Sequence, residues 1–250
     1  NPAYIFLMFF SIIINYLAVI LLEKTDKQSK KKMYLLISLI SSLGLLFLYK
    51  YFNFFNGLLG SIINFAGGNY SFSGLDLILP MGISFYTFQT LSYTIDVYRG
   101  NCKAERHFGY FALYVTFFPQ LVAGPIERSD RLLPQLHQSH KFDYTRVVAG
   151  LRRMLWGFLK KVIIADNLAA VVNIIFANPQ NYDGFTLIIG VLFFNIQIYC
   201  DFSAYSDIAI GSAKVMGIEL MENFRRPYFA RNIAEFWKRW HISLTTWFKD

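Results

Sequence analysis

Charged residues are scarce in this chain. Only 16% of its 250 residues are Asp, Glu, Lys or Arg, whereas 55% are hydrophobic. A soluble domain of this length needs more charge on its surface than that. Long apolar stretches with little charge point instead to a lipid bilayer as the surrounding medium. The composition therefore predicts an integral membrane protein and argues against a soluble globular enzyme.

Cysteine and familiar catalytic motifs are also lacking. The two cysteines, Cys102 and Cys200, are far apart and have no metal-like spacing, so neither a disulfide framework nor a zinc site follows from them. His137 and His140 have no third ligand nearby, and a solvated loop is the stronger interpretation of this pair. No glycine-rich phosphate loop, zinc-protease helix or nucleophile elbow is present in the sequence. We expect no bound metal and no resident cofactor.

Acidic residues are fewer than basic residues, and the formal net charge is +8. The basic residues fall in short blocks between apolar runs, as in residues 24–32, which hold five lysines. Such blocks are typical of cytoplasmic loops and of contacts with anionic lipid headgroups. We therefore expect membrane lipid as a partner and no nucleic acid.

Several apolar runs are long enough to cross a membrane. Residues 4–22 would span roughly 30 Å as a helix, which is the thickness of a hydrocarbon core. Residues 33–49 form a second candidate span, and residues 50–65 either lie at the interface or continue that helix. Residues 185–218 form a further long apolar stretch. These runs predict a polytopic helical protein.

Two apolar segments contain helix breakers. Pro80 and Gly82 interrupt residues 75–98, which predicts a kinked or broken span. Residues 108–123 are short, contain Pro119 and precede Gly124-Pro125, which favours a tilted or re-entrant segment. Backbone without its hydrogen bonds survives at membrane depth only where it is buried in protein or lines a wet cavity. An internal chamber is therefore expected.

Amphipathic patterns mark two other segments. Residues 146–161 have a basic face, with Arg152, Arg153, Lys160 and Lys161 predicted to contact headgroups, and residues 162–176 continue as an apolar helix. Residues 233–249 place aromatic side chains on one helical face, with His241 at its edge. We predict one all-α membrane domain over residues 1–250, with broken and interfacial segments.

Carboxylates within apolar sequence are candidates for function. Asp201 and Asp207 lie in the apolar stretch 185–218, where an ionised group costs at least ~2.5 kcal/mol near the centre of a membrane helix. They could line a polar cavity or proton path, or they could pair with Arg or Lys of a neighbouring helix. Asp96 and Asp166 stand close to basic residues, and ion pairing is the stronger interpretation for them.

His241 is the histidine with the most suggestive surroundings. A neutral histidine on the apolar side of a helix is usually structural, but an imidazole beside a membrane cavity can exchange protons near neutral pH. From the residues alone, the sequence indicates a polytopic membrane protein with a buried polar chamber.

Four sequence blocks resemble one known family. They are LPMGISFYTFQ (residues 79–89, followed by YTID at 93–96), FFPQLVAGPI (117–126), DFSAYSDIAIG (201–211), and ENF (222–224) running on to EFWKRWHISL (235–244). In this order they resemble the membrane-bound O-acyltransferase (MBOAT) family, in its bacterial alginate O-acetyltransferase branch. The resemblance extends from residue 50 to the end.

The resemblance implies helices around a central tunnel with a funnel on each side. It implies transfer of an acyl group from a thioester to a hydroxyl, with His241 matching one of two polar positions associated with catalysis. The second is a histidine that would lie beyond residue 250, and the N-terminal spans of the family are also missing here. We therefore interpret the chain as an internal fragment of a longer enzyme and expect the fragment alone to be inactive.

The functional hypothesis follows from that resemblance. The full protein would be a multi-pass enzyme of a bacterial inner membrane that moves an acetyl group from a cytoplasmic donor such as acetyl-CoA to an exported polysaccharide, directly or through an extracytoplasmic acyltransferase partner. Expected tunnel residues are Asp201, Asp207, Asn223, Trp237 and Trp240.

Alternatives stay open at this point. Within the family, they are peptidoglycan O-acetylation and D-alanylation of teichoic acid. Outside it, broken spans with intramembrane carboxylates also suit a transporter. A non-catalytic scaffold of a polymer-modifying complex is the third class.

Overall fold

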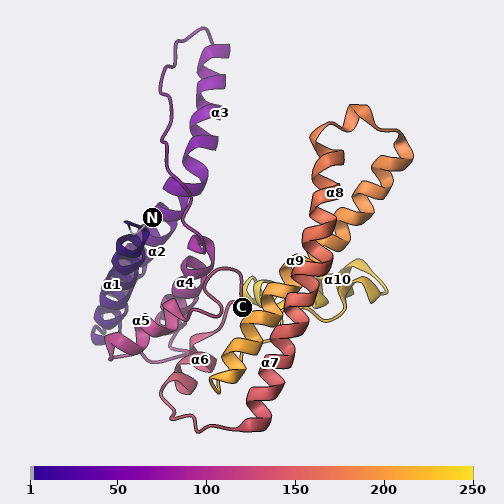
Figure 1. The fold of residues 1–250 in the computed structure, drawn as a ribbon. Coiled ribbons are helices and arrows are strands. Elements are labelled where there is room, and N and C mark those ends of the chain that lie inside the picture. Colours follow the sequence, from indigo (N-terminus) through magenta and orange to yellow (C-terminus); the bar gives the residue numbers. More distant parts are fainter. Residues whose placement is uncertain (1–2, 250) are drawn as a thin grey trace. The chain divides into compact units, whose positions relative to one another are not determined.

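The structure, a computed structural model, describes residues 3–249. In this part of the chain every regular element is a helix, which confirms the expected all-α class. Three helices are long and apolar enough to cross a membrane, judged by length and composition: Tyr4–Lys24, Gln28–Phe65 and Gly184–Val215. The chain forms two compact units (Figure 1). The first contains the residues up to Thr116 together with Arg128–Asp130, and the second contains Phe117–Glu127 and the residues from Arg131 onward.

The first unit contains five α-helices: α1 (Ala3–Lys24), α2 (Gln28–Leu46), α3 (Phe52–Phe65), α4 (Ile83–Arg99) and α5 (Phe108–Thr116). A π-helical turn, η1 (Phe47–Tyr51), joins α2 to α3, so residues 50–65 continue the second span rather than leaving it. The resulting helix has 38 residues.

The break predicted within residues 75–98 is larger than a kink. Residues 68–80 have no helix, and α4 begins only after Gly82, which has a left-handed φ of 78°. The residue before a proline is disfavoured in the helical region, and a glycine adopts positive φ at little cost. The break therefore removes the first part of the expected span. Similarly, α5 ends at Thr116, three residues before Pro119, and turns follow it.

Neutral polar side chains hold the helices of the first unit together. Asn15 of α1 is fully buried and donates to Ser42 of α2 over 3.0 Å. Ser38 of α2 donates to Asn15 through a short hydrogen bond, and its hydroxyl oxygen lies 3.1 Å from that of Thr94 of α4. Hydrogen bonds between helices are a common form of cohesion in membrane proteins, where apolar contacts alone discriminate poorly against lipid. This small network therefore connects α1, α2 and α4.

The second unit contains the remaining elements. They are α6 (Ser129–Leu136, from Arg131 onward), α7 (Tyr144–Phe158), η2 (Leu159–Ala165), α8 (Asp166–Ala177), η3 (Pro179–Asn181), α9 (Gly184–Val215), η4 (Pro227–Phe229), α10 (Ile233–Arg239) and α11 (Ile242–Trp247). The π-helical turn η2 joins α7 to α8, which confirms the expected continuation through residues 162–176. The side chain of Asp143 caps α7, and that of Asp183 caps α9.

Helices α7 and α9 lie side by side (Figure 1), and glycines allow their close approach. A Cβ atom added to Gly150 of α7 would lie 2.7 Å from the backbone oxygen of Gly211 on α9. One added to Gly157 would lie 2.8 Å from the backbone oxygen of Ala204. Small residues at a helix interface permit this close backbone approach. As a result, long side chains next to these glycines reach across to the facing helix.

The single amphipathic helix predicted over residues 233–249 is wrong. The structure breaks it between α10 and α11, because Trp240 is extended and His241 adopts a left-handed conformation with φ of 43°. The apolar face that suggested one helix is divided between two short ones.

Candidate functional site

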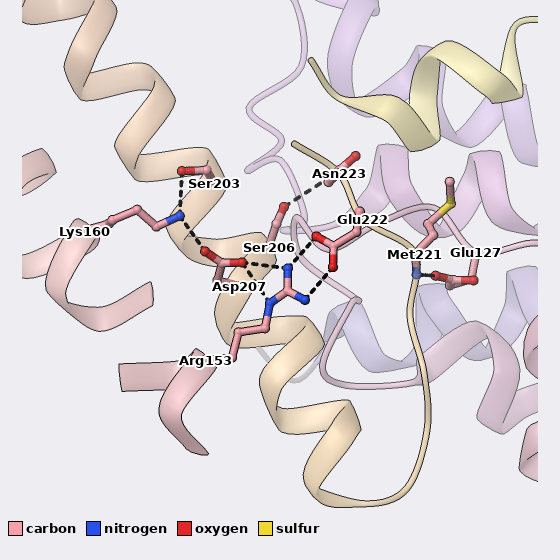
Figure 2. A network of polar contacts seen from close by, with 9 residues as sticks. All are labelled: Glu127, Arg153, Lys160, Ser203, Ser206, Asp207, Met221, Glu222 and Asn223. Atoms are coloured by element: carbon pink, nitrogen blue, oxygen red, sulfur yellow. Dashed lines mark hydrogen bonds and ion pairs between the residues drawn. The ribbon is translucent and has the colours of Figure 1, made fainter. Parts of the chain in front are cut away.

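Four charged side chains of the second unit form one network of polar contacts (Figure 2). Arg153 of α7 forms a two-pronged pair with Glu222, with N–O distances of 2.6 and 2.5 Å, and its Nε lies 2.9 Å from Asp207 of α9. Lys160 donates to the other oxygen of Asp207 over 2.6 Å and to the hydroxyl of Ser203 over 2.9 Å. We call Arg153, Lys160, Asp207 and Glu222 the ion network. Its two cations and two anions balance, which limits the penalty for removing charge from water.

The π-helical turn η2 lets two consecutive lysines both reach carboxylates on α9. Lys160 contacts Asp207, and Lys161 contacts Asp201 and Asp166 at 2.8 Å each. In a regular α-helix, neighbouring residues point about 100° apart and do not share a face. The wider turn, together with long flexible side chains, directs both toward α9. π-Helical turns within α-helices are frequent at functional sites.

The segment between α9 and η4 is fixed at several points, and we call residues 218–224 the connector. Gln135 of α6 donates to the backbone oxygen of Glu219 and accepts from its N–H. The buried carboxylate of Glu127 accepts from the N–H of Met221 (Figure 2). Arg153 then holds Glu222. These contacts fix the backbone directly before Asn223.

A cavity of about 650 Å³ opens beside the ion network. Six Lys or Arg side chains and only two carboxylates line it, so its wall is positively charged. The basic residues are Arg153, Lys160, Arg225, Arg226, Lys238 and Arg239. A smaller cavity of about 360 Å³ shares Arg153, Ile210, Glu222 and Arg225 with it. The Arg153–Glu222 pair therefore stands in the wall between the two spaces.

His241 stands at the break between α10 and α11, and the connector holds it there. The backbone oxygen of Asn223 accepts from the N–H of Ile242 over 2.9 Å, and its side-chain oxygen accepts from the hydroxyl of Ser243 over 2.9 Å. The imidazole packs edge-on against Phe202 of α9, with ring centroids 4.7 Å apart. A left-handed backbone is uncommon for a residue other than glycine and persists where neighbouring contacts hold it.

Burial lowers the pKa of His241 to about 4. The ring is therefore neutral at physiological pH, which is the form that can accept a proton. The hydrogen bonds from Arg153 lower the pKa of Glu222, so this carboxylate stays ionised at neutral pH although it is partly buried. At neutral pH, His241 is therefore uncharged and Glu222 is negatively charged.

The site residues predicted from the sequence lie in different parts of the second unit. Asp207 and Asn223 line the larger cavity, whereas Asp201 is half-exposed and pairs with Lys161. Trp240 packs in an aromatic cluster, and Trp237 is 53% exposed. His241 is not among the residues lining the cavity, but Asn223 and Arg239, which flank its turn, are.

Ion pairing accounts for the other carboxylates weighed in the sequence. Asp207 satisfies both interpretations, since it pairs with Arg153 and Lys160 and also lines the cavity. Asp96 pairs with Arg128 at 3.6 Å and Asp166 with Lys161 at 2.8 Å, which confirms the expected ion pairs.

Sequence reasoning missed three of the four members of the ion network. Arg153 and Lys160 were predicted to contact lipid headgroups, but they point toward α9 and bind Asp207. Their spacing of seven residues places them on one helical face, opposite a carboxylate that already needed a partner. Glu222 gave no such signal beyond its place in the ENF block, because it lies outside a helix.

Comparison with known proteins defines the class. A family model described as MBOAT, the membrane-bound O-acyltransferase family, matches residues 106–250. The chain therefore belongs to the membrane-bound O-acyltransferase family, and the resemblance noted in the sequence is confirmed.

Three individual relatives with described activities are similar to this chain. A Pseudomonas aeruginosa protein described as a probable alginate O-acetylase is 44% identical over 220 residues, which cover 87% of this chain and 41% of that protein. A peptidoglycan O-acetyltransferase of Helicobacter pylori is 34% identical across 100% of the chain and 51% of its own length. A teichoic acid D-alanyltransferase of Bacillus subtilis is 31% identical over 70% of the chain and 45% of its length. The chain thus spans about half or less of each of these relatives.

Proposed function

We propose that the full protein transfers an acetyl group from a cytoplasmic thioester donor, such as acetyl-CoA, to hydroxyls of an exported cell-surface polysaccharide. The transfer is direct or passes through an extracytoplasmic partner, and the protein is a multi-pass component of a bacterial inner membrane. Membership of the family and the 44% identity to an alginate O-acetylase support acyl transfer to a polysaccharide. The three apolar helices support a membrane location.

The observation that carries this proposal is the positively charged cavity beside the turn that holds His241. A thioester donor such as acetyl-CoA carries phosphate groups, and Arg and Lys side chains bind phosphates well. Arg225, Arg226 and Lys238 line the cavity and are available for that role. The ion network leaves its own cations neutralised, so the excess positive charge lies in the remaining basic residues.

The reaction needs a group that takes or directs the proton of the acceptor hydroxyl, and His241 supplies a neutral imidazole. The acceptor oxygen attacks the thioester carbonyl, a C–O bond forms, the C–S bond breaks, and the hydroxyl proton ends on the released thiol. A neutral imidazole assists by accepting that proton or by orienting the group that does. We assign His241 to one of these two roles, with the expected downstream histidine as the main base.

The test is acetyl transfer from labelled acetyl-CoA in membranes that carry the full protein and its partner proteins. We expect His241→Ala, at equal expression, to lower the label in the polymer by about 100-fold or more, the usual range for an acid–base group. Lys238→Ala should raise the KM for acetyl-CoA several-fold with a smaller change in kcat. Wild-type activity in the His241→Ala variant would overturn the assigned role.

Two other acceptors are supported by particular relatives. The Helicobacter pylori protein covers the whole chain and is named for peptidoglycan O-acetylation, and the Bacillus subtilis protein is named for D-alanyl transfer to teichoic acid. Mass analysis of both the polymer and the transferred group separates the three reactions.

A further inference from the structure

We propose that Asn223 is a positioning residue that holds the His241 ring in its working orientation. This inference rests on the role assigned to His241 under the proposed function. Asn223 is fully buried, and four hydrogen bonds connect it to the two elements on either side of it.

The first step of the argument is the set of bonds on the His241 side. The backbone oxygen of Asn223 accepts from the N–H of Ile242. Its side-chain oxygen accepts from Ser243 twice, from the N–H at 3.3 Å and from the hydroxyl at 2.9 Å. Asn223 therefore binds the two residues that directly follow His241, where the chain leaves its left-handed conformation and starts α11.

The second step is the anchor on the opposite side. The amide nitrogen of Asn223 donates to the hydroxyl of Ser206 on α9 over 3.3 Å (Figure 2). Phe202, which packs against the imidazole, lies one helical turn before Ser206 on α9. Asn223 thus ties the backbone that carries the ring to the helix against which the ring packs.

The third step is the rigidity of Asn223 itself. Its neighbour Glu222 forms the two-pronged pair with Arg153, and Met221 is held by Glu127. Met221 and Glu222 directly precede Asn223 in the chain. Their contacts hold the connector in place, and the hydrogen bonds of Asn223 hold the turn at His241 against the connector. Displacing a catalytic group by about 1 Å can cost about 100-fold in rate, so a fixed position has kinetic value.

The test compares Asn223→Ala with Asn195→Ala in the full protein in its membrane. Asn195 is an exposed asparagine of α9 whose side chain donates to the backbone of Val191 in its own helix. We expect Asn223→Ala to lower kcat for acetyl transfer by about 10- to 100-fold with KM within about twofold, and Asn195→Ala to leave both unchanged. An unchanged kcat in Asn223→Ala would overturn the proposal.

A second set of variants separates positioning from general damage. In a His241→Ala background, Asn223→Ala should cause no further loss, because its effect passes through the missing ring. A further tenfold loss there would make Asn223 merely structural and would also overturn the proposal. Asn223→Asp keeps the acceptor oxygen for Ser243 and should recover part of the activity. If Asn223→Ala fails to accumulate, Ser243→Ala takes its place, with a several-fold loss of kcat expected and an unchanged kcat counting against the proposal.

A readout without catalysis distinguishes this proposal from the proposed function. Diethyl pyrocarbonate modifies neutral imidazoles, and mass spectrometry locates the modified histidine. We expect modification of His241 to be at least fivefold faster in Asn223→Ala than in the wild type or Asn195→Ala. Equal rates would overturn the positioning role even if acetyl transfer occurs. A faster rate together with no acetyl transfer in the wild type would leave the positioning role in place and reject the proposed reaction.

Discussion

The two units of the chain use polar residues inside their helix packing in different ways. In the first unit, Asn15, Ser38 and Thr94 bind one another as neutral groups, and a buried neutral group with a partner costs little. In the second unit, the ion network uses four charges beside a cavity of about 650 Å³. Charges in such a place are costly and often functional. The first unit therefore joins its helices through neutral groups, whereas the second joins them through balanced charges that also line a positively charged cavity.

The largest effect should come from unbalancing the ion network. Asp207→Ala leaves Arg153 and Lys160 without their shared carboxylate, and removing one partner of a buried pair typically costs about 3–5 kcal/mol. Thermal unfolding of the full protein in detergent measures the loss. Asp201→Ala is the matched control, because Asp201 is half-exposed and its partner Lys161 keeps a second carboxylate, Asp166, so a smaller loss is expected. Equal losses in the two variants would contradict the distinction.

A smaller effect is expected where α7 and α9 touch. Gly211→Ala would place a Cβ 2.7 Å from the backbone oxygen of Gly150, and overpacking of this kind costs about 1–3 kcal/mol. Gly44→Ala in the first unit has nothing within 4 Å of the new atom and replaces glycine within a helix, so it should stabilise by up to about 1 kcal/mol. Unfolding midpoints that shift in opposite directions would agree with this prediction. A loss in both variants would contradict it.

The neutral network should matter for stability alone. Asn15→Ala removes its bonds to Ser38 and Ser42, and interhelical bonds in membranes average about 0.6 kcal/mol each, so a loss of about 1–2 kcal/mol is expected. Acetyl transfer per folded molecule should stay unchanged. A selective loss of kcat in this variant would mean that the first unit also contributes to the reaction.

The last prediction is that the His241 ring stays unprotonated as the pH is lowered from 7.5 to 5. An ordinary imidazole gains its proton as the pH falls through about 6.5, and burial moves this change for His241 to about 4. Its intrinsic reactivity toward diethyl pyrocarbonate, relative to N-acetylhistidine, should therefore rise as the pH is lowered from 7.5 to 5, because only the reference becomes protonated. A constant ratio would show that the His241 ring titrates normally.

The helical class and the first spans could be predicted from sequence because hydropathy and length decide them. The run at residues 4–22 became α1 with its ends shifted by no more than two residues. Residues 50–65 were ambiguous, because Lys50 and Asn53 look interfacial. Their helix is continuous through a π-helical turn, which leaves no mark in the hydrophobic pattern.

The candidate site was less predictable because its contacts join residues far apart in sequence. Asp207 could be selected from its cost in an apolar segment, but its partners Arg153 and Lys160 lie on α7 and η2. Glu222, which pairs with Arg153, lies on the non-helical connector. The break at His241 is accompanied by hydrogen bonds that Asn223, 18 residues earlier, accepts from Ile242 and Ser243. A helical wheel assumes regular geometry and cannot reveal this break.

The π-helical turn at residues 159–165 has a consequence for how this sequence tolerates insertion and deletion. A π-helical turn is equivalent to an α-helix that has gained one residue. Deleting one residue there would let the segment close as a regular α-helix while α8 keeps nearly its present rotation relative to α7, because the wide turn absorbs the extra residue. The turn would then carry one side chain fewer, and Lys160 and Lys161 would not both keep their present directions toward α9. We therefore expect a one-residue deletion within residues 159–165 to fold but to lose one of the two lysine contacts with α9, either Lys160 with Asp207 or Lys161 with Asp201.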